Sequence, residues 1–193
     1  MNEGIDDKLV IREVLGGNRE AFALLVDKYK SGLYRLLLGM GANAQDAQDL
    51  AQESFIKAYQ KLPDHNSQSS FAAWLYAIAI NRLRDLKRRK KVSLAALPLL
   101  REASPPLTPE EQYMRKEEEL EWQGRLVRLP ERYRIILLLR YANELTYEEI
   151  CEITGLSMHQ VKNRLHRSRQ KLKKQWSQAK EDSSEQMELY QSR

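Results

Sequence analysis

The chain has 193 residues and a formal net charge of +5, with 31% charged and 42% hydrophobic residues. This length allows one medium domain or two small ones, and a single cysteine excludes an internal disulfide. We find no signal peptide and no apolar run of membrane-spanning length, which predicts a cytoplasmic protein without direct membrane insertion. Two basic clusters, at 82–91 and 162–174, hold the positive excess and indicate a polyanionic partner.

Helical periodicity dominates the chain, and no segment shows the alternation typical of a β-strand. Apolar residues recur at helical spacing at 19–40, 46–62 and 71–91. Each of these stretches can bury one face against the others. The sequence therefore predicts an all-α fold whose first domain, a compact bundle, occupies residues 1–91.

Prolines mark the end of this first domain. Residues 92–112 carry Pro98, Pro105, Pro106 and Pro109, which break helices and favour an extended chain. Drawn out, this predicted linker would reach about 65 Å, close to the roughly 70 Å of two turns of DNA. Its apolar segment at 94–100 is unusual for a solvated tether, and its role stays open. A second helical domain is expected at 113–176, followed by a flexible tail at 177–193.

The second domain contains the pattern of a helix-turn-helix at about 146–165. Thr146 and Glu149 fit a capping box at the start of a short helix. Ser157 and Gln160 fit another box at the start of a longer helix, and a glycine between the two boxes predicts the turn.

The longer helix is basic, whereas the shorter one is acidic. Val161, Leu165 and Leu172 are expected to hold the longer helix inward. Amide and guanidinium groups pair bidentately with purine edges in the major groove, and further cations suit phosphates. A basic amphipathic helix alone is more often a solvated surface, but the two caps, the glycine and the charge reversal favour DNA binding. The predicted DNA-facing residues are Met158, His159, Gln160, Asn163, Arg164, Arg167, Ser168 and Lys171.

Three segments carry a resemblance to a known family. They read DAQDLAQESFIKAY, then FAAWLYAIAINRLRDLKRRKK, then LPERYRIILLLRYANELTYEEICEITGLSMHQVKNRLHRSRQKL. In this order, with a proline-bearing linker between the second and the third, they resemble a bacterial RNA polymerase sigma factor of the extracytoplasmic-function type, in group 4 of the sigma-70 family. The resemblance implies a promoter-specificity subunit that binds core RNA polymerase and directs transcription initiation, in a stress or envelope response.

The resemblance also implies a role for each domain. The first domain would be sigma region 2, which docks on core polymerase and reads and opens the −10 promoter element. The second domain would be sigma region 4, which reads the −35 element. The polymerase surfaces implied are the clamp helices of the largest subunit and the flap.

Site residues in the first domain follow from the same resemblance. One helix face would bind the clamp, the loop at 63–70 would capture an extruded base, and the third helix would hold promoter DNA. The ordinary alternatives are a solvated helix face, a generic surface loop and, for Trp74, a core position. The implied polymerase-binding residues are Asp46, Asp49, Gln52 and Glu53, and the implied −10 residues are His65, Asn66, Ser67, Trp74, Asn81, Arg84, Lys87 and Arg88.

Control is expected from outside the chain. The resemblance implies an anti-sigma factor, often anchored in the membrane, and the sequence predicts no built-in inhibitor. An autonomous helix-turn-helix regulator is the alternative function. We find no metal-ligand spacing, glycine-rich phosphate loop or nucleophile with its base, so no metal, cofactor or enzymatic activity is expected.

Overall fold

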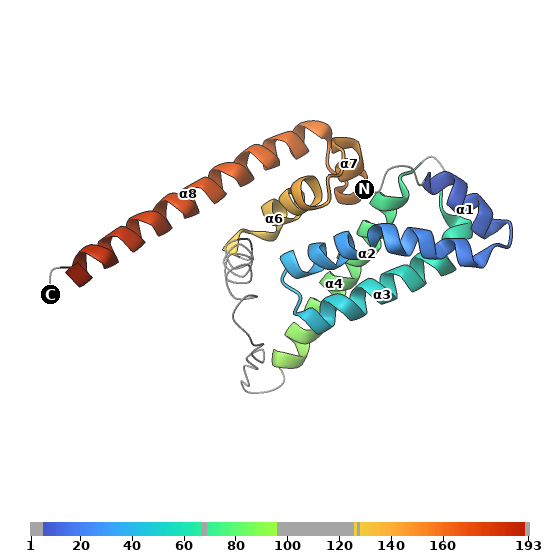
Figure 1. Cartoon of the computed structure of the whole chain (residues 1–193), viewed down its shortest axis with the longest axis horizontal. Coiled ribbons are helices and arrows are strands. Elements are labelled where there is room, and N and C mark those ends of the chain that lie inside the picture. The colour runs from blue at the N-terminus through green and yellow to red at the C-terminus, as the bar shows by residue number, and fades with distance from the viewer. Residues whose placement is uncertain (1–5, 67–68, 96–125, 127, 192–193) are drawn as a thin grey trace.

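The computed structural model describes residues 6–66, 69–95, 126 and 128–191. Within these ranges every regular element is helical, which confirms the all-α prediction. Most of the predicted linker, the first residues of the predicted second domain and Ser67 lie outside the described residues. The elements in Figure 1 are α1 (Asp7–Leu15), the 3₁₀ turn η1 (Arg19–Ala21), α2 (Phe22–Gly39), α3 (Ala44–Gln60), the 3₁₀ turn η2 (Leu62–Asp64), α4 (Phe71–Ala95), α6 (Glu131–Leu137), the π-helical turn η3 (Leu138–Ala142), α7 (Tyr147–Thr154) and α8 (Met158–Gln191).

Helices α2, α3 and α4 form the first bundle, and α1 packs against α2. The predicted apolar face of α2 is buried, since Leu25, Leu33 and Leu36 have no exposed surface. Asn43 starts α3 because its side chain accepts a hydrogen bond from the backbone N–H of Asp46 at 2.7 Å. The bundle therefore follows from the periodicity and cap that the sequence contains.

The second domain has the predicted helix-turn-helix. Thr146 and Glu149 form the complete capping box of α7, and the backbone N–H of Ser157 donates to Gln160 Oε1 at 2.9 Å at the start of α8. Gly155 turns the chain in the left-handed region, with φ of 66°, where a side chain would be strained.

The helix that carries the helix-turn-helix is longer than the second domain predicted from the sequence. Helix α8 continues to Gln191, although we expected a flexible tail from residue 177. Residues 177–191 contain neither glycine nor proline, and Glu and Gln, which favour helix, are among their commonest residues, so no residue in them stops the helix.

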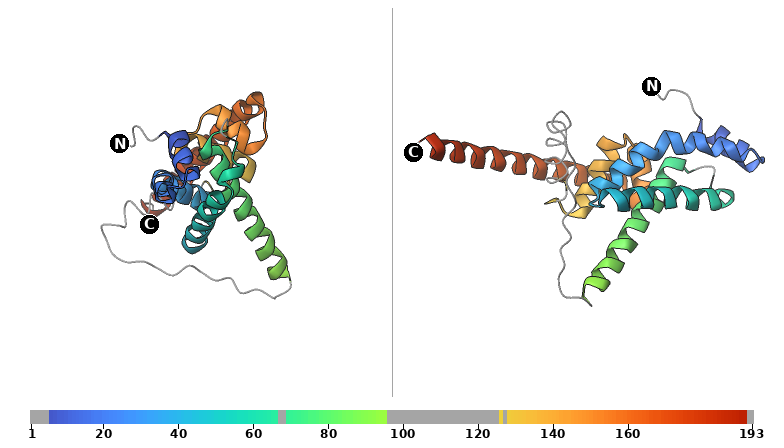
Figure 2. Two further views of the ribbon diagram at one scale, coloured as in Figure 1. Left: turned by 90° about the vertical axis from the view of Figure 1, so that its right-hand side faces the viewer. Right: turned by 60° about the horizontal axis from the view of Figure 1, so that its bottom comes forward.

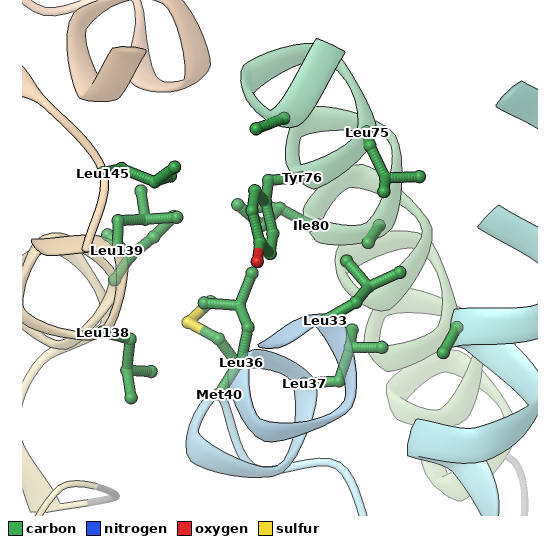
Figure 3. Close-up of a cluster of buried hydrophobic side chains, with 14 of the residues drawn as sticks. Leu33, Leu36, Leu37, Met40, Leu75, Tyr76, Ile80, Leu138, Leu139 and Leu145 are labelled. Carbon is green, nitrogen blue, oxygen red and sulfur yellow. The ribbon is translucent and has the colours of Figure 1, made fainter. Parts of the chain in front are cut away.

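The two domains share one continuous hydrophobic core. Figure 3 shows Leu138 and Leu139 of η3 facing Leu36 and Met40 of α2 and the side chains of α4. The approach is close, since a Cβ added to Gly39 would lie 2.6 Å from Leu138 Cδ2. Helix α7 packs on α4. Figure 2 shows the later parts of α4 and α8 extending away from this centre in different directions.

The loop between α3 and α4 is held by an enclosed histidine. The ring of His65 lies 4.7 Å from the Trp74 ring and 6.0 Å from the Phe71 ring, measured between centroids. Both ring nitrogens are buried and have no hydrogen-bond partner among the described residues. Burial lowers the pKa of His65, because a charged imidazolium would lose its hydration, and the nearby Glu152 opposes this shift.

This depressed pKa predicts a pH-dependent stability. In the unfolded chain His65 takes up a proton near its ordinary pKa of 6.5, whereas the folded chain does so only at lower pH. Its contribution to stability is therefore present above pH 6.5 and falls as the pH drops through the depressed value. Denaturant unfolding from about pH 7.5 to about pH 5 should show a smaller loss of stability for His65→Phe than for wild type. The exposed-site control His159→Phe should behave like wild type, and equal losses in all three proteins would contradict the explanation.

Candidate nucleic-acid interface

Helix α8 presents a polar and basic face outside the helix-turn-helix. Val161, Leu165 and Leu172 are buried as predicted and hold the helix against the rest of the domain. This packing orients the opposite face toward solvent. The predicted residues that are exposed there are His159, Gln160, Asn163, Arg167 and Lys171, and Met158 and Arg164 are half-buried.

Ser168 is a correction to the predicted DNA face. Its side chain is fully buried. Its hydroxyl donates to the carbonyl oxygen of Arg164 at 2.5 Å, and the carbonyl oxygen of Tyr133 lies 3.2 Å from the same hydroxyl. Ser168 lies three residues after Leu165 and four before Leu172, which is the spacing of residues on one face of a helix. It therefore belongs to the buried face that Val161, Leu165 and Leu172 form. Ser168 therefore joins α8 to α6 and cannot reach a base from this position.

Short contacts order several polar side chains of α8. Asn163 Nδ2 lies 2.8 Å from His159 Nε2, one turn earlier. The Gln160 oxygen is used by the capping box, which leaves its amide nitrogen to point outward. Such pre-ordered amides lose little rotamer freedom when they contact a base edge.

The lysines and arginines from 162 to 174 of α8 have no acidic partner among the described residues. Two of them instead lie over tyrosine rings, Lys162 at 5.9 Å from the Tyr147 centroid and Lys171 at 5.7 Å from the Tyr133 centroid. A concentrated positive charge without acidic partners attracts a polyanion such as the DNA backbone.

The predicted −10 residues lie on the other domain. A cavity of about 590 Å³ lies beside the loop, lined by Arg12, His65, Ser70, Phe71 and neighbours from α1. His65 does not offer a polar edge to this cavity, because its nitrogens are enclosed, so its predicted contact with a base edge is not available in this arrangement. Trp74 is half-buried against His65 and therefore also supports the loop.

The basic residues of α4 are largely neutralised, in contrast to those of α8. Arg84 Nε donates to Glu131 Oε1 at 2.8 Å, and Arg88 lies 3.0 Å from Asp85. Lys87 Nζ donates to the Met40 carbonyl at 2.5 Å, and burial lowers the pKa of Lys87. Asn81 is exposed.

The predicted polymerase-binding face of α3 is exposed and partly paired with α4. Asp46 accepts from Lys90 at 2.6 Å, and Glu53 pairs with Arg82. Asp49 and Gln52 are exposed.

An apolar groove beside this face was not predicted. The groove has a volume of about 840 Å³ between α2 and α3 and is lined by residues that include Phe22, Tyr34, Gln52 and Phe55. Ile56, 50% exposed, lies on its edge. The sequence carries no specific signal for this groove, since a single exposed apolar residue such as Ile56 is normal on a protein surface.

Further classes of site are not found in the described part of the chain. None of its helices has the length and apolarity needed to cross a bilayer. Within the same residues no three His, Cys, Asp or Glu side chains gather as metal ligands would.

Comparison with known proteins places these features in a family. Residues 25–92 match the model for sigma-70 region 2, and residues 120–172 match the model for sigma-70 region 4. The ECF RNA polymerase sigma factor SigW of Bacillus subtilis (strain 168) is 34% identical over 175 residues, which cover 86% of this chain and 94% of SigW.

Solved structures agree in fold. CnrH, solved in complex with the cytosolic domain of CnrY, gives a TM-score of 0.72 at 24% identity, covering 89% of this chain and 97% of CnrH. The sigma factor RpoE of Bartonella quintana, solved in complex with the anti-sigma factor NepR, gives a TM-score of 0.63 at 21% identity. The match covers 79% of this chain and 94% of RpoE. The chain contains two consecutive sigma-70 regions, and it aligns with SigW over most of the length of that protein. It therefore belongs to the extracytoplasmic-function sigma factors of bacterial RNA polymerase.

Proposed function

We propose that this sigma factor reads the −35 promoter element with α8 and the −10 element with α4 and the loop before it. We further propose that it docks on core polymerase through α3. In this proposal residues 1–91 act as region 2, residues 113–176 as region 4 and residues 92–112 as the linker. The chain acts in the cytoplasm and leaves the chemistry of transcription to the polymerase.

The observation that carries the −35 assignment is the unneutralised face of α8. Its inner row is fixed by apolar packing, so the cations from 162 to 174 and the amide of Asn163 keep one orientation relative to α7. A helix presented in this way fits the major groove, with amides and arginines at base edges and lysines at phosphates. Ser168 has no part in this readout, since it is buried.

Replacing Arg164 or Arg167 by alanine tests this assignment. We expect each change to weaken binding to a −35 duplex by about 1–3 kcal/mol and to spare non-specific duplexes, because bidentate base contacts carry sequence information. The −35 sequence is first identified by run-off transcription with core polymerase on genomic fragments, followed by mapping of the start sites. Fluorescence anisotropy with a duplex of that sequence then gives the affinities. Arg132→Ala of α6 is the matched control. Equal weakening on every duplex would reassign the two arginines to phosphates.

Polymerase docking is supported by the two kinds of surface on α3. Its acids form a polar patch, and the groove beside them exposes Ile56 and aromatic edges. Stable protein interfaces combine an apolar centre with a polar rim, and this arrangement has both.

The double change Asp49→Lys with Glu53→Lys tests the docking surface. Charge reversal should abolish association with core polymerase, because two acids that would face a basic partner become repulsive. A pull-down without DNA measures this, with circular dichroism as the check on folding. The control Glu13→Lys with Glu20→Lys makes the same change of charge at exposed positions near α1 and should retain binding. Unchanged association of the α3 variant would move the docking surface elsewhere, and no association of wild type would favour an autonomous regulator.

We propose an anti-sigma factor as a further partner. The Bartonella quintana sigma factor of the same fold was solved with one. The apolar groove between α2 and α3 offers this chain a surface for such a protein, so an inhibitor seated there would compete with polymerase.

A further inference from the structure

A small basic hollow lies between the segment before α6 and the later part of α8. Its volume is about 190 Å³, and it is lined by Arg128, Leu129, Pro130, Lys171, Lys174 and Gln175. Arg128, Lys171 and Lys174 are exposed, and Arg128 is outside the set of residues predicted to contact DNA. Two separate parts of the domain therefore bring three cationic side chains around one small space.

No acid among the described residues neutralises these three cations. None of the side chains that line the hollow is acidic, and none of the three cations forms a salt bridge with a described residue. Glu131, the acid nearest to Arg128 along the chain, instead accepts from Arg84 at 2.8 Å. An anion with several oxygen atoms suits such a cluster, because each oxygen can accept from a different cation.

Buried packing fixes the two sides of the hollow relative to each other. Helix α6 packs along α8 (Figure 1). Leu129 is buried, and the hydroxyl of Ser168 lies 3.2 Å from the carbonyl oxygen of Tyr133, which joins the two helices. Lys171 Nζ lies 5.7 Å from the centroid of the Tyr133 ring, a contact that favours this side of α8 for its side chain. The cations therefore lose little conformational freedom when they bind an anion.

The hollow continues the row of α8 residues that we assign to the −35 element. Arg167, Lys171 and Lys174 are spaced four and three residues apart, which places them on one side of the helix. Lys174 follows Arg167 by seven residues, which is about 10 Å along the helix axis. The major groove is about 12 Å wide. When Arg167 reads a base edge, the hollow consequently lies near the border of the groove, where the phosphates are.

We propose that Arg128, Lys171 and Lys174 form a binding site for one phosphate group of the DNA backbone, at the border of the −35 element. The site adds Arg128, which precedes the helix-turn-helix, to the contact with DNA. It reads no base. It determines how α8 lies in the groove, because phosphate contacts set the position and orientation of a protein on the duplex. This inference rests on the proposed role of α8.

Arg128→Ala and Lys174→Ala test the site in the full-length chain. Each should weaken binding to a −35 duplex and to a mixed-sequence duplex by a similar factor, about five- to tenfold near 0.1 M salt. The slope of log affinity against log salt concentration should become shallower by about 1, because one fewer phosphate is neutralised. Fluorescence anisotropy measures both quantities, and circular dichroism checks the fold.

Two further variants control for charge and for position. Arg128→Lys keeps the positive charge in the hollow and should keep most of the salt slope. Arg132→Ala removes the same charge from an exposed site of α6 that does not line the hollow. It should keep the wild-type affinity and slope. An equal loss for Arg132→Ala and Arg128→Ala would overturn the site, because the effect would then come from the general charge of the domain.

Neutral backbone analogues identify the phosphate. In a series of −35 duplexes one phosphate at a time is replaced by a methylphosphonate, which carries no charge. At one position near the border of the element this replacement should weaken binding of wild type and of Arg132→Ala, but not of Arg128→Ala, which has already lost the contact. Losses that are additive at every position would overturn the site.

Inorganic phosphate and the choice of duplex separate this inference from its foundation. Calorimetric titration of the full-length chain with inorganic phosphate tests for a free anion. Saturable binding that Arg128→Ala abolishes, without any loss on DNA, would overturn the assignment to the backbone. A wild-type preference for the −35 duplex that Arg128→Ala leaves unchanged in affinity and slope would overturn the hollow alone. Wild type without any preference for the −35 duplex would overturn the role of α8 as well.

Discussion

The packing of η3 on α2 helps to fix how the two sets of helices lie relative to one another. Leu138 and Leu139 have almost no exposed surface, and they join two sets of helices into a single core. The Leu138 side chain lies against Gly39 of α2, and α7 packs on α4. The predicted −10 residues Asn66, Asn81, Arg84 and Arg88 remain exposed beside this junction, as do most of the predicted −35 residues of α8.

The basic residues of α4 and of α8 also differ in how far acidic residues neutralise them. Arg82, Arg84, Arg88 and Lys90 of α4 pair with acids of α3, of α4 itself and of the second domain. The lysines and arginines from 162 to 174 of α8 have no acidic partner among the described residues. Net charge alone could not reveal this difference, since both helices are strongly basic in the sequence. Partly exposed pairs such as Arg84 with Glu131 are each worth little, so the contact between the two sets of helices depends mainly on its apolar packing.

Sequence reasoning succeeded where the interactions are local. The caps at Thr146 and Ser157 and the turn at Gly155 each depend on residues within a few positions, and all are present in the structure. Sequence reasoning failed for Ser168. We predicted an exposed position because serine is polar, although its spacing from Leu165 and Leu172 puts it on the buried face of the helix. The contact of Ser70 with Glu149 joins residues 79 positions apart, and nothing local in the sequence indicates it.

One carboxylate links the local and the distant interactions. Glu149 Oε2 accepts from the backbone N–H of Thr146 at 2.8 Å and closes the capping box, while Oε1 accepts from Ser70. The first bond holds the cap of α7, and the second joins that cap to the loop before α4. A change at Glu149 would therefore act on the start of α7 and on its contact with the first bundle together.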